Sequence, residues 1–183
     1  SATASITARY VDAVAAVPGN RARIVDTRKT IPGLRVAQKY AVQVGGGLNH
    51  RMGLFDAILI KENHITAAGG VAQVLAQAGA FAHELQFIEI EVETLAQLQE
   101  ALDAGAKMVL LDNMPAEQLR QAVALNAGRA VLEVSGGVNL DTVAALAATG
   151  VDRISIGAIT KDIKAVDFSL RFDQSFAQHI SGA

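Results

Sequence analysis

The stretches ALDAGAKMVLLDN at residues 101–113 and ALAATGVDRISIGA at residues 145–158 share one pattern. Each runs from an amphipathic helix through a glycine and a short loop into an apolar strand that ends in polar residues. A repeated helix–strand unit predicts strict alternation of strands and helices, and hence a parallel sheet with right-handed crossovers. Two α/β folds fit this pattern, a barrel and an open doubly wound sheet.

Further apolar runs extend the alternation along the chain. We expect about seven strands, at 23–26, 41–44, 57–61, 87–93, 108–112, 131–134 and 153–156. Amphipathic helices are expected between them, including 71–78 and 95–104, the latter capped by Thr94 with Gln97 and stopped by Gly105. No glycine-rich phosphate loop or GxGxxG motif follows a strand, so the pattern favours the barrel.

The length of 183 residues is short for a barrel, because such barrels typically need about 250 residues. Residues 1–18 carry Ile6, Tyr10 and Val14 at helical spacing, with no capping residue expected ahead of them. We therefore expect 1–18 to be a helix that the chain enters partway along. Residues 19–183 are expected to form the barrel domain.

Composition narrows the class of protein. Hydrophobic residues make up 51% and charged residues 19% of the chain, which is enough apolar material for a buried core. The absence of cysteine excludes disulfides, thiolate metal sites and thiol nucleophiles. A net charge of −2 with 4% aromatic residues disfavours a nucleic-acid partner, and neither a membrane span nor a signal peptide is recognisable. We expect a soluble, cytoplasmic protein.

Basic side chains gather at one predicted rim of the sheet. In parallel α/β folds, functional sites lie beyond the carboxyl ends of the strands. Five basic or potentially basic residues follow the first three expected strands: Arg28, Lys29, His50, Arg51 and Lys61. Each could singly be a solvated loop residue, but together, in a chain of negative net charge, they predict a small polyanionic ligand.

Acidic residues alternate with apolar ones in the segment 88–93, IEIEVE. If helices cover the Ile/Val face, the face bearing Glu89, Glu91 and Glu93 looks into the barrel. A sheet edge with one solvated face is the alternative. Because buried carboxylates need cations, we predict that Glu91 and Asp112 bind a ligand that is rich in hydroxyls or carries Mg²⁺.

The last two expected strands end in SGG at 135–137 and SIGA at 155–158. Glycines at these ends let backbone N–H groups approach phosphate oxygens, so the two loops predict a phosphate clamp. Of the histidines, His83 and His179 are expected at the surface, and His64 is expected to hydrogen-bond the loop after Lys61.

Several longer motifs resemble one enzyme family. They are DTRKTIPG at 26–33, KYAV at 39–42, GGGLNHR at 45–51, LIKENHI at 59–65, EIEVE at 89–93, LLDN at 110–113, EVSGG at 133–137 and SIGA at 155–158. In order and over essentially the whole chain, they closely resemble the decarboxylating quinolinate phosphoribosyltransferases, also called nicotinate-nucleotide pyrophosphorylases. The resemblance implies an incomplete seven-stranded α/β (TIM-like) barrel, preceded in the family by an N-terminal domain. It further implies that the helix at 1–18 leads from such a domain, which is absent from this chain.

The resemblance also implies a reaction of NAD biosynthesis, in which quinolinate and phosphoribosyl pyrophosphate give nicotinate mononucleotide, pyrophosphate and CO2 with Mg²⁺. By similarity, the two quinolinate carboxylates are held by Arg28, His50, Arg51 and Lys61. Phosphoribosyl pyrophosphate is expected against Thr27, Lys29, Glu91, Asp112, Ser135, Gly136, Gly137, Gly157, Ala158 and Lys161.

Within this set, Lys29, Glu91 and Asp112 are the predicted catalytic residues, and Glu91 and Asp112 the predicted Mg²⁺ ligands. Lys161 stands where family members carry His or Lys as a phosphate contact. The resemblance further implies a homodimer, or a higher oligomer, in which the N-terminal domain supplies an arginine to the partner's site.

Two other functions fit the residues less closely. One is another phosphate-binding barrel enzyme, such as a related pyridine phosphoribosyltransferase or a phosphosugar isomerase. The other is a folded but catalytically silent fragment.

Overall fold

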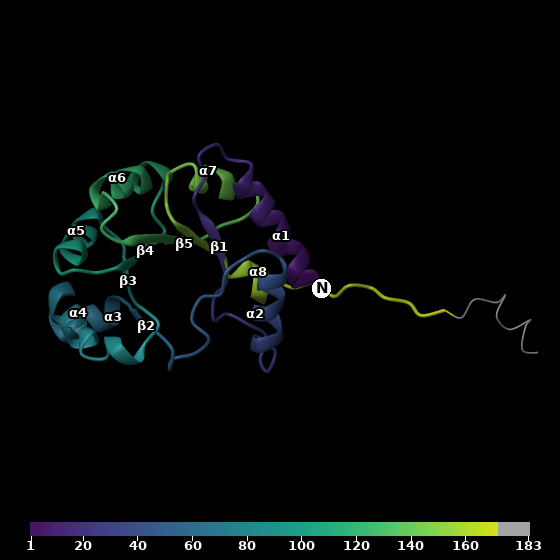
Figure 1. Cartoon of the computed structure of the whole chain (residues 1–183), viewed down its shortest axis with the longest axis horizontal. Helices are drawn as coiled ribbons and strands as arrows, with labels where there is room; N and C mark the ends of the chain where they lie inside the picture. Colours follow the sequence, from purple (N-terminus) through teal and green to yellow (C-terminus); the bar gives the residue numbers. More distant parts are fainter. Residues whose placement is uncertain (172–183) are drawn as a thin grey trace, which may run out of the picture.

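Six parallel strands form the interior of the protein in a computed structural model that describes residues 1–171. Their spatial order is β1-β6-β5-β4-β3-β2. Their bounds are β1 Arg23–Val25, β2 Ile58–Ile60, β3 Ile88–Val92, β4 Met108–Asp112, β5 Val131–Ser135 and β6 Arg153–Ser155. Figure 1 shows that this sheet is curved. The barrel is incomplete because β1 and β2 remain edge strands. The predicted α/β fold class is confirmed.

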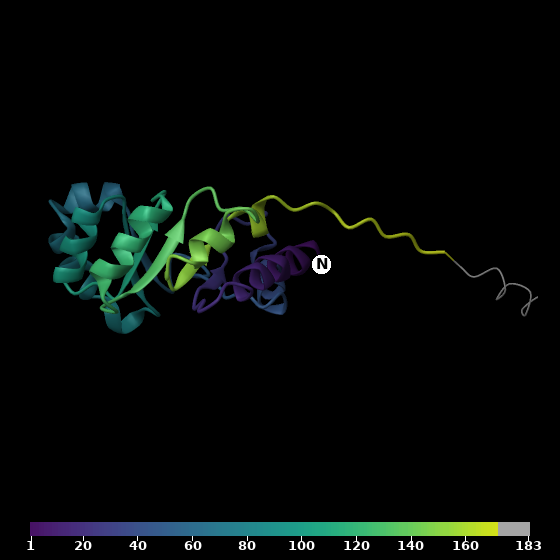
Figure 2. The ribbon, with the colours of Figure 1, turned by 90° about the horizontal axis from the view of Figure 1, so that it is seen from above.

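Helices cover the outside of this sheet as an arc (Figure 1). They are α1 Ala2–Ala15, α2 Arg35–Val44, α3 Glu62–Ala68, α4 Val71–Gly79, α5 Leu95–Asp103, α6 Ala116–Asn126, α7 Val143–Ala147 and α8 Ala158–Lys161, with a 3-10 turn at Ala82–Glu84. None of the helices in residues 1–171 has the length and apolar character that crossing a membrane requires. Figure 2 shows that residues 163–171 run away from this body as an extended segment.

The strand predicted at 41–44 is wrong, and the sheet has six named strands instead of seven. These residues are the last turn of α2, whose buried side chains Gln38, Lys39 and Val42 follow helical spacing. The place beside β1 is taken by Leu48, which pairs with Val25 as a single parallel bridge. A run of four residues is too short to distinguish the 3.6-residue period of a helix from the two-residue period of a strand. The sequence AVQV therefore fits a strand equally well.

The expectation for the start of the first helix is also wrong. Ser1 is the N-cap of α1, and its hydroxyl accepts a hydrogen bond from the Ala4 N–H at 3.3 Å. The expected cap of α5 is confirmed, because the Thr94 hydroxyl accepts from Gln97 N–H at 3.1 Å. The Gln97 side chain accepts in turn from the Glu93 N–H at 2.9 Å.

Alternation along β3 separates the apolar core from the barrel interior. Ile90 and Val92 are fully buried in the hydrophobic core, which includes Leu98 from α5. On the opposite face, Glu89 is fully buried inside the barrel and Glu91 lies at its open end. The predicted inward face of acidic residues is therefore confirmed for these two positions, whereas Glu93 lies beyond the strand and is exposed.

A buried ion pair joins α2 to the end of β1. Lys39 Nζ lies 2.5 Å from Asp26 Oδ1, and both side chains are at most 1% exposed. The same carboxylate accepts from the His50 N–H at 2.8 Å and from the Asn49 amide at 2.6 Å. Asp26 thereby holds the segment after α2 against the edge strand β1.

This network predicts a large stability loss for Lys39→Met. Removing one partner of a buried ion pair leaves the other charge uncompensated and costs about 3–5 kcal/mol. Urea denaturation should show this loss in the free energy of unfolding. The control is K107M at an exposed loop lysine, where a change within about 0.5 kcal/mol is expected. Equal effects of the two variants would contradict this account.

Candidate active site

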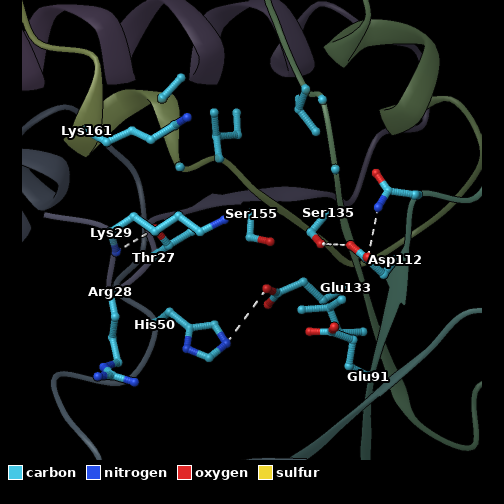
Figure 3. Close-up of a pocket in the computed structure, with 18 of the residues that line it drawn as sticks. Thr27, Arg28, Lys29, His50, Glu91, Asp112, Glu133, Ser135, Ser155 and Lys161 are labelled. Atoms are coloured by element: carbon cyan, nitrogen blue, oxygen red, sulfur yellow. Dashed lines mark hydrogen bonds and ion pairs between the residues drawn. The ribbon is translucent and has the colours of Figure 1, made fainter. Parts of the chain in front are cut away.

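A cavity of about 870 Å³ opens at the carboxyl ends of the strands (Figure 3). All fourteen residues that the sequence singled out line it: Thr27, Arg28, Lys29, His50, Arg51, Lys61, Glu91, Asp112, Ser135, Gly136, Gly137, Gly157, Ala158 and Lys161. They come from six strand ends and from the segment after α2. The structure thus brings the predicted set together, while the roles of the individual residues stay predictions.

The loop after β1 is held rigidly against its neighbours. Thr27 Oγ1 accepts from the Lys29 N–H at 3.1 Å, and the Thr160 hydroxyl donates to the Lys29 carbonyl at 2.6 Å. Arg35 of α2 donates to the Arg28 carbonyl at 3.2 Å and to the Thr30 hydroxyl at 3.1 Å. These bonds fix the backbone from which the Arg28 and Lys29 side chains reach the cavity.

Glycine lines the side of the cavity nearest α8. A Cβ built at Gly157 would come 3.4 Å from Lys29 Cδ, 3.7 Å from Lys161 Cε and 3.8 Å from Thr27 Oγ1. The missing side chain therefore leaves a small space between two lysine side chains. Gly136 differs, because its φ is +100° and a Cβ there would collide with the Asn113 amide oxygen.

Two carboxylates line the opposite side of the cavity. Asp112 Oδ1 accepts from the Ser135 hydroxyl at 2.7 Å, and Oδ2 accepts from the Asn113 amide at 2.8 Å. Glu91 Oε2 pairs with Lys61 Nζ at 2.5 Å. Carboxylate oxygens are the ligands that Mg²⁺ prefers, and one or two suffice when substrate phosphates complete the shell. Glu91 and Asp112 fit that donor set.

Two guanidinium groups are gathered at the cavity without acidic partners. Within residues 1–171, neither Arg28 nor Arg51 forms an ion pair with a carboxylate, and Arg28 Nε is buried without a hydrogen-bond partner. Burial, and then the positive charge of Arg28, lower the pKa of Arg51 from its ordinary value. An anionic ligand would relieve this repulsion and supply the missing acceptors.

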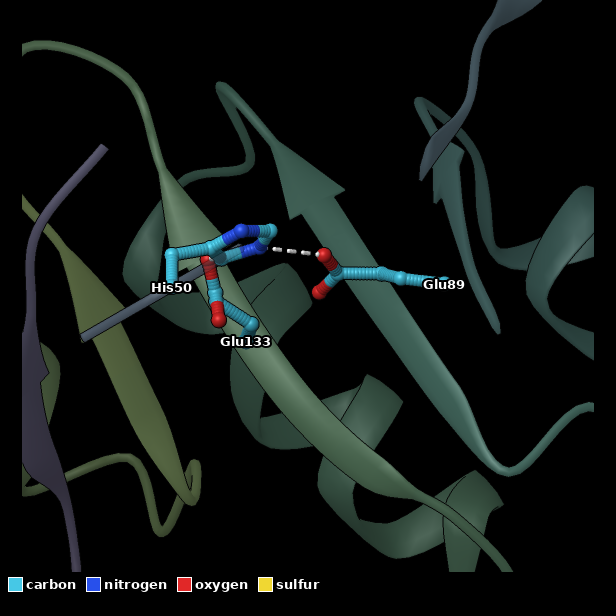
Figure 4. Close-up of side chains that lie close together, drawn as sticks. All are labelled: His50, Glu89 and Glu133. Atoms are coloured by element: carbon cyan, nitrogen blue, oxygen red, sulfur yellow. Dashed lines mark hydrogen bonds and ion pairs between the residues drawn. The ribbon is translucent and has the colours of Figure 1, made fainter. Parts of the chain in front are cut away.

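The His50 ring is neutral and fully engaged. Its Nδ1 accepts from the Arg51 N–H at 2.8 Å, so the ring proton resides on Nε2 and is donated to Glu89 Oε2 at 2.7 Å (Figure 4). Burial lowers the pKa of His50, which favours the same neutral form. The predicted contact between His50 and a ligand carboxylate would require the ring to release Glu89.

Sequence reasoning missed Glu133, which lies at the floor of the cavity beside His50 (Figure 3). The residue is fully buried, and neither carboxyl oxygen has a hydrogen-bond partner. Burial, and then the charge of the nearby Glu89, raise the pKa of Glu133 to about 8. The inward alternation that identified Glu91 would have found Glu133 too, because Leu132 and Val134 on either side face the core.

Other side chains in the lining had weaker signals. They include Tyr10 of α1, Asn113, Asn139, Ser155 and Asp162. Of the histidines, His64 Nδ1 accepts from the Lys61 N–H at 2.9 Å, which confirms its predicted loop contact. His83 is exposed as expected, and His179 lies outside the described residues.

Fold and cavity together define a class of protein. The chain is an incomplete parallel α/β barrel whose strand ends surround a polar cavity with basic groups suited to bind a small anion. Residues 3–171 match the family described as quinolinate phosphoribosyl transferase, C-terminal domain. The chain therefore belongs to this family, and the resemblance of its motifs is confirmed.

Relatives support this assignment. The chain is 46% identical to the nicotinate-nucleotide pyrophosphorylase [carboxylating] of Mycobacterium leprae, covering 93% of this chain and 60% of that protein. It is 41% identical to quinolinate phosphoribosyltransferase [decarboxylating] 1 of Nicotiana glauca, covering 98% and 55%. The chain thus spans little more than half the length of these curated relatives.

Solved structures agree with the fold. The nicotinate-nucleotide pyrophosphorylase from Francisella tularensis is 48% identical with a TM-score of 0.86, over 91% of this chain and 58% of that one. NadC from Streptococcus pyogenes is 45% identical with a TM-score of 0.87, over 94% and 59%.

The protonation of Glu133 predicts a pH effect on stability. Its pKa is about 8 in the folded chain against an ordinary value of 4.5. At a pH between these two values, the folded state therefore holds a proton that the unfolded state has released. This contribution to the free energy of unfolding is therefore lost as pH rises through that window. E133Q removes the contribution, so the variant should gain stability relative to the parent between about pH 5 and pH 8.

Urea denaturation across that range measures the effect. E93Q, at an exposed glutamate outside the cavity, should follow the parent chain at every pH. A constant difference between E133Q and the parent would show that Glu133 is ionised throughout.

Proposed function

We propose that this chain carries the catalytic cavity of a quinolinate phosphoribosyltransferase. In the proposed reaction, the pyridine nitrogen of quinolinate takes the phosphoribosyl group, and pyrophosphate and CO2 leave to give nicotinate mononucleotide. The observation that carries the proposal is the pair Arg28 and Arg51, which lines the cavity without acidic partners. Quinolinate offers two carboxylates to such a pair.

The two substrates would occupy opposite parts of the cavity. Arg28, Arg51 and Lys61 hold the pyridine dicarboxylate. Lys29 and Lys161, with the space left by Gly157 between them, hold phosphate groups of phosphoribosyl pyrophosphate. Ser135, Gly136, Gly137 and Ala158 also line the cavity and are proposed to contact the same substrate. Binding both substrates in one cavity converts a bimolecular reaction into an intramolecular one.

Bond breaking at the ribose needs no nucleophile from the protein. As pyrophosphate leaves, positive charge develops on the ribose ring, and the carboxylates of Glu91 and Asp112 stabilise it. The ring nitrogen of quinolinate then attacks the ribose carbon. Lys29 contributes by neutralising the negative charge that develops on the leaving pyrophosphate.

Glu91 and Asp112 would also hold Mg²⁺, which neutralises charge on the pyrophosphate when it is bound. In that arrangement, Lys61 keeps Glu91 oriented through their 2.5 Å ion pair. The Ser135 and Asn113 hydrogen bonds orient Asp112 in the same way.

The complete protein is proposed to act as a homodimer, with an arginine from the partner's N-terminal domain completing the site. A cytoplasmic location is proposed as well, although some plant relatives carry names that place them in mitochondria or chloroplasts.

Ligand binding and turnover test the proposal. Quinolinate should raise the unfolding temperature of the chain, and nicotinic acid, which has one carboxylate fewer, should raise it much less. Nicotinate mononucleotide formation should be measured for this chain and for a longer form that includes an N-terminal domain. Equal protection by the two acids would contradict the dicarboxylate site. Turnover by the longer form alone would support a silent fragment, and a lack of turnover in both forms would contradict the proposed function.

Arg51→Ala should weaken quinolinate binding selectively. Loss of one partner of a buried charged hydrogen bond costs about 2–5 kcal/mol, or a factor of roughly 30 or more in Kd. Phosphoribosyl pyrophosphate binding should change little, because its phosphates are proposed to lie against Lys29, Gly157 and Lys161. Calorimetry measures both constants. R120A, at an exposed arginine of α6, is the control, and equal losses for the two ligands would refute the assigned role.

Gly157→Ala should weaken phosphoribosyl pyrophosphate binding without unfolding the chain. The φ of Gly157 is −66°, and the added methyl meets only ordinary van der Waals distances, so the fold tolerates it. The methyl would occupy the space between Lys29 and Lys161 that a phosphate group needs. Calorimetry should show reduced affinity for phosphoribosyl pyrophosphate and unchanged affinity for quinolinate, whereas G79A, at a helix end outside the cavity, should change neither.

A further inference from the structure

Glu133 is a carboxyl group for which the reaction outlined above has no use. It lies on β5 at the centre of the cavity floor, with both oxygens buried and without hydrogen-bond partners. Leaving a buried polar group unsatisfied costs free energy, so such groups in a cavity point to a ligand or to chemistry.

The groups that face Glu133 come from three elements. His50 Nε2 lies 3.7 Å from Oε1, and Arg153 of β6 lies 4.0 Å from Oε2. Glu89 of β3 lies on the other side of the His50 ring nitrogen (Figure 4). Ser155 of β6 is the remaining polar neighbour, and its hydroxyl donates to the Val134 carbonyl at 3.3 Å. No cation therefore forms a close ion pair with Glu133 in the described chain.

A metal ion is a poor occupant of this cluster. His50, Glu89 and Glu133 could place three ligand atoms around an ion. Coordination through His50 Nε2 would, however, move the ring proton to Nδ1, where it would face the Arg51 N–H that Nδ1 now accepts. Two donors would then oppose each other at 2.8 Å. The observed tautomer favours a proton in this cluster over a metal.

Tyr10, Lys29, Lys161 and Asp162 line the cavity from α1, from the loop after β1 and from α8. The remaining acids in the lining are engaged elsewhere. His50 gives its only ring proton to Glu89, and Lys61 is paired with Glu91. Both Asp112 carboxyl oxygens accept a hydrogen bond, from Ser135 and from Asn113. Arginine does not release a proton in proteins. Glu133 remains as a buried acid next to His50, at the end of the cavity where Arg51 would hold the pyridine carboxylates.

We propose that Glu133 is a further catalytic residue, the acid that protonates the ring carbon from which CO2 departs. This inference rests on the proposed function. The bond between the ring carbon and its carboxylate breaks, CO2 leaves, and the electron pair stays on the ring carbon beside the positive nitrogen. That carbon takes the Glu133 proton, and Glu133 becomes a carboxylate. Solvent returns a proton to it after the product leaves the open cavity.

A neutral Glu133 also suits the binding step. A second negative charge on the cavity floor would repel the incoming dianion, whereas a carboxylic acid does not. The raised pKa of Glu133, about 8, is consistent with a proton held there at neutral pH. A proton donor at the cavity floor also traps the carbanion before CO2 can add to it again.

The test separates phosphoribosyl transfer from the final step. E133Q keeps the size and neutrality of the side chain but supplies no acidic proton. In a single turnover, pyrophosphate release should stay near the parent level while nicotinate mononucleotide falls at least tenfold and the undecarboxylated quinolinate mononucleotide accumulates. E133D should recover part of the product. E93Q should behave as the parent in both measurements.

The outcomes distinguish this inference from the function it rests on. Absence of any turnover in the parent protein would sink the proposed function itself. Normal product formation by E133Q, or a parallel fall of pyrophosphate and product, would overturn only the role of Glu133. Infrared difference spectra of this chain give a measurement independent of turnover. The band of protonated carboxyl groups at neutral pH should be clearly weaker in E133Q than in the parent, because Glu89 contributes to the same band in both proteins. Equal bands in the two proteins would also overturn the proposal.

Discussion

The buried Asp26 carboxylate is the interaction on which the site depends. In a closed barrel, a strand ladder would secure the segment that follows α2. Here Leu48 is the one residue of that segment that pairs with β1, whose other edge pairs with β6. Asp26 replaces the ladder by binding Lys39 and the backbone N–H of His50 with the same oxygen. Hydrogen bonds to the Asp26 side chain therefore hold this edge, where strand pairing would hold it in a closed barrel. Because His50 and Arg51 follow directly, the geometry of the cavity depends on this carboxylate.

Charge in the barrel interior is arranged in layers. Above the cavity floor, the Lys61–Glu91 ion pair and two guanidiniums that pair with no carboxylate in residues 1–171 prepare the site for anions. Below them, His50 is neutral, and burial raises the pKa of both Glu89 and Glu133 to about 8. The layer under the substrate region thus carries hydrogen-bonding groups with little net charge. Such a floor avoids the desolvation cost of several buried ions and leaves the attraction for ligands to the groups above it.

The ends of the strands could be predicted because two independent signals agree there: the apolar pattern of the strand and the polar residues that follow it. Apolar alternation located β3 and β4 within a residue or so, and their polar ends identified the cavity lining. The strand prediction for residues 41–44 is wrong because the buried face of α2 includes Gln38 and Lys39. These residue types indicate solvent exposure, and the burial of Lys39 is made favourable by two groups distant in the sequence, the Asp26 carboxylate and the His50 carbonyl. Glu133 was overlooked for a similar reason, since an isolated glutamate in an apolar run has no local partner that marks it as functional.

Position 51 serves the site through two separate parts of one residue. Its backbone N–H determines which nitrogen of His50 carries the proton, while its guanidinium lines the cavity. Any residue other than proline supplies the same N–H. Evolution can therefore exchange the side chain to suit another acid without disturbing the imidazole beneath it. In this cavity, ligand preference and the chemistry of the floor can diverge independently.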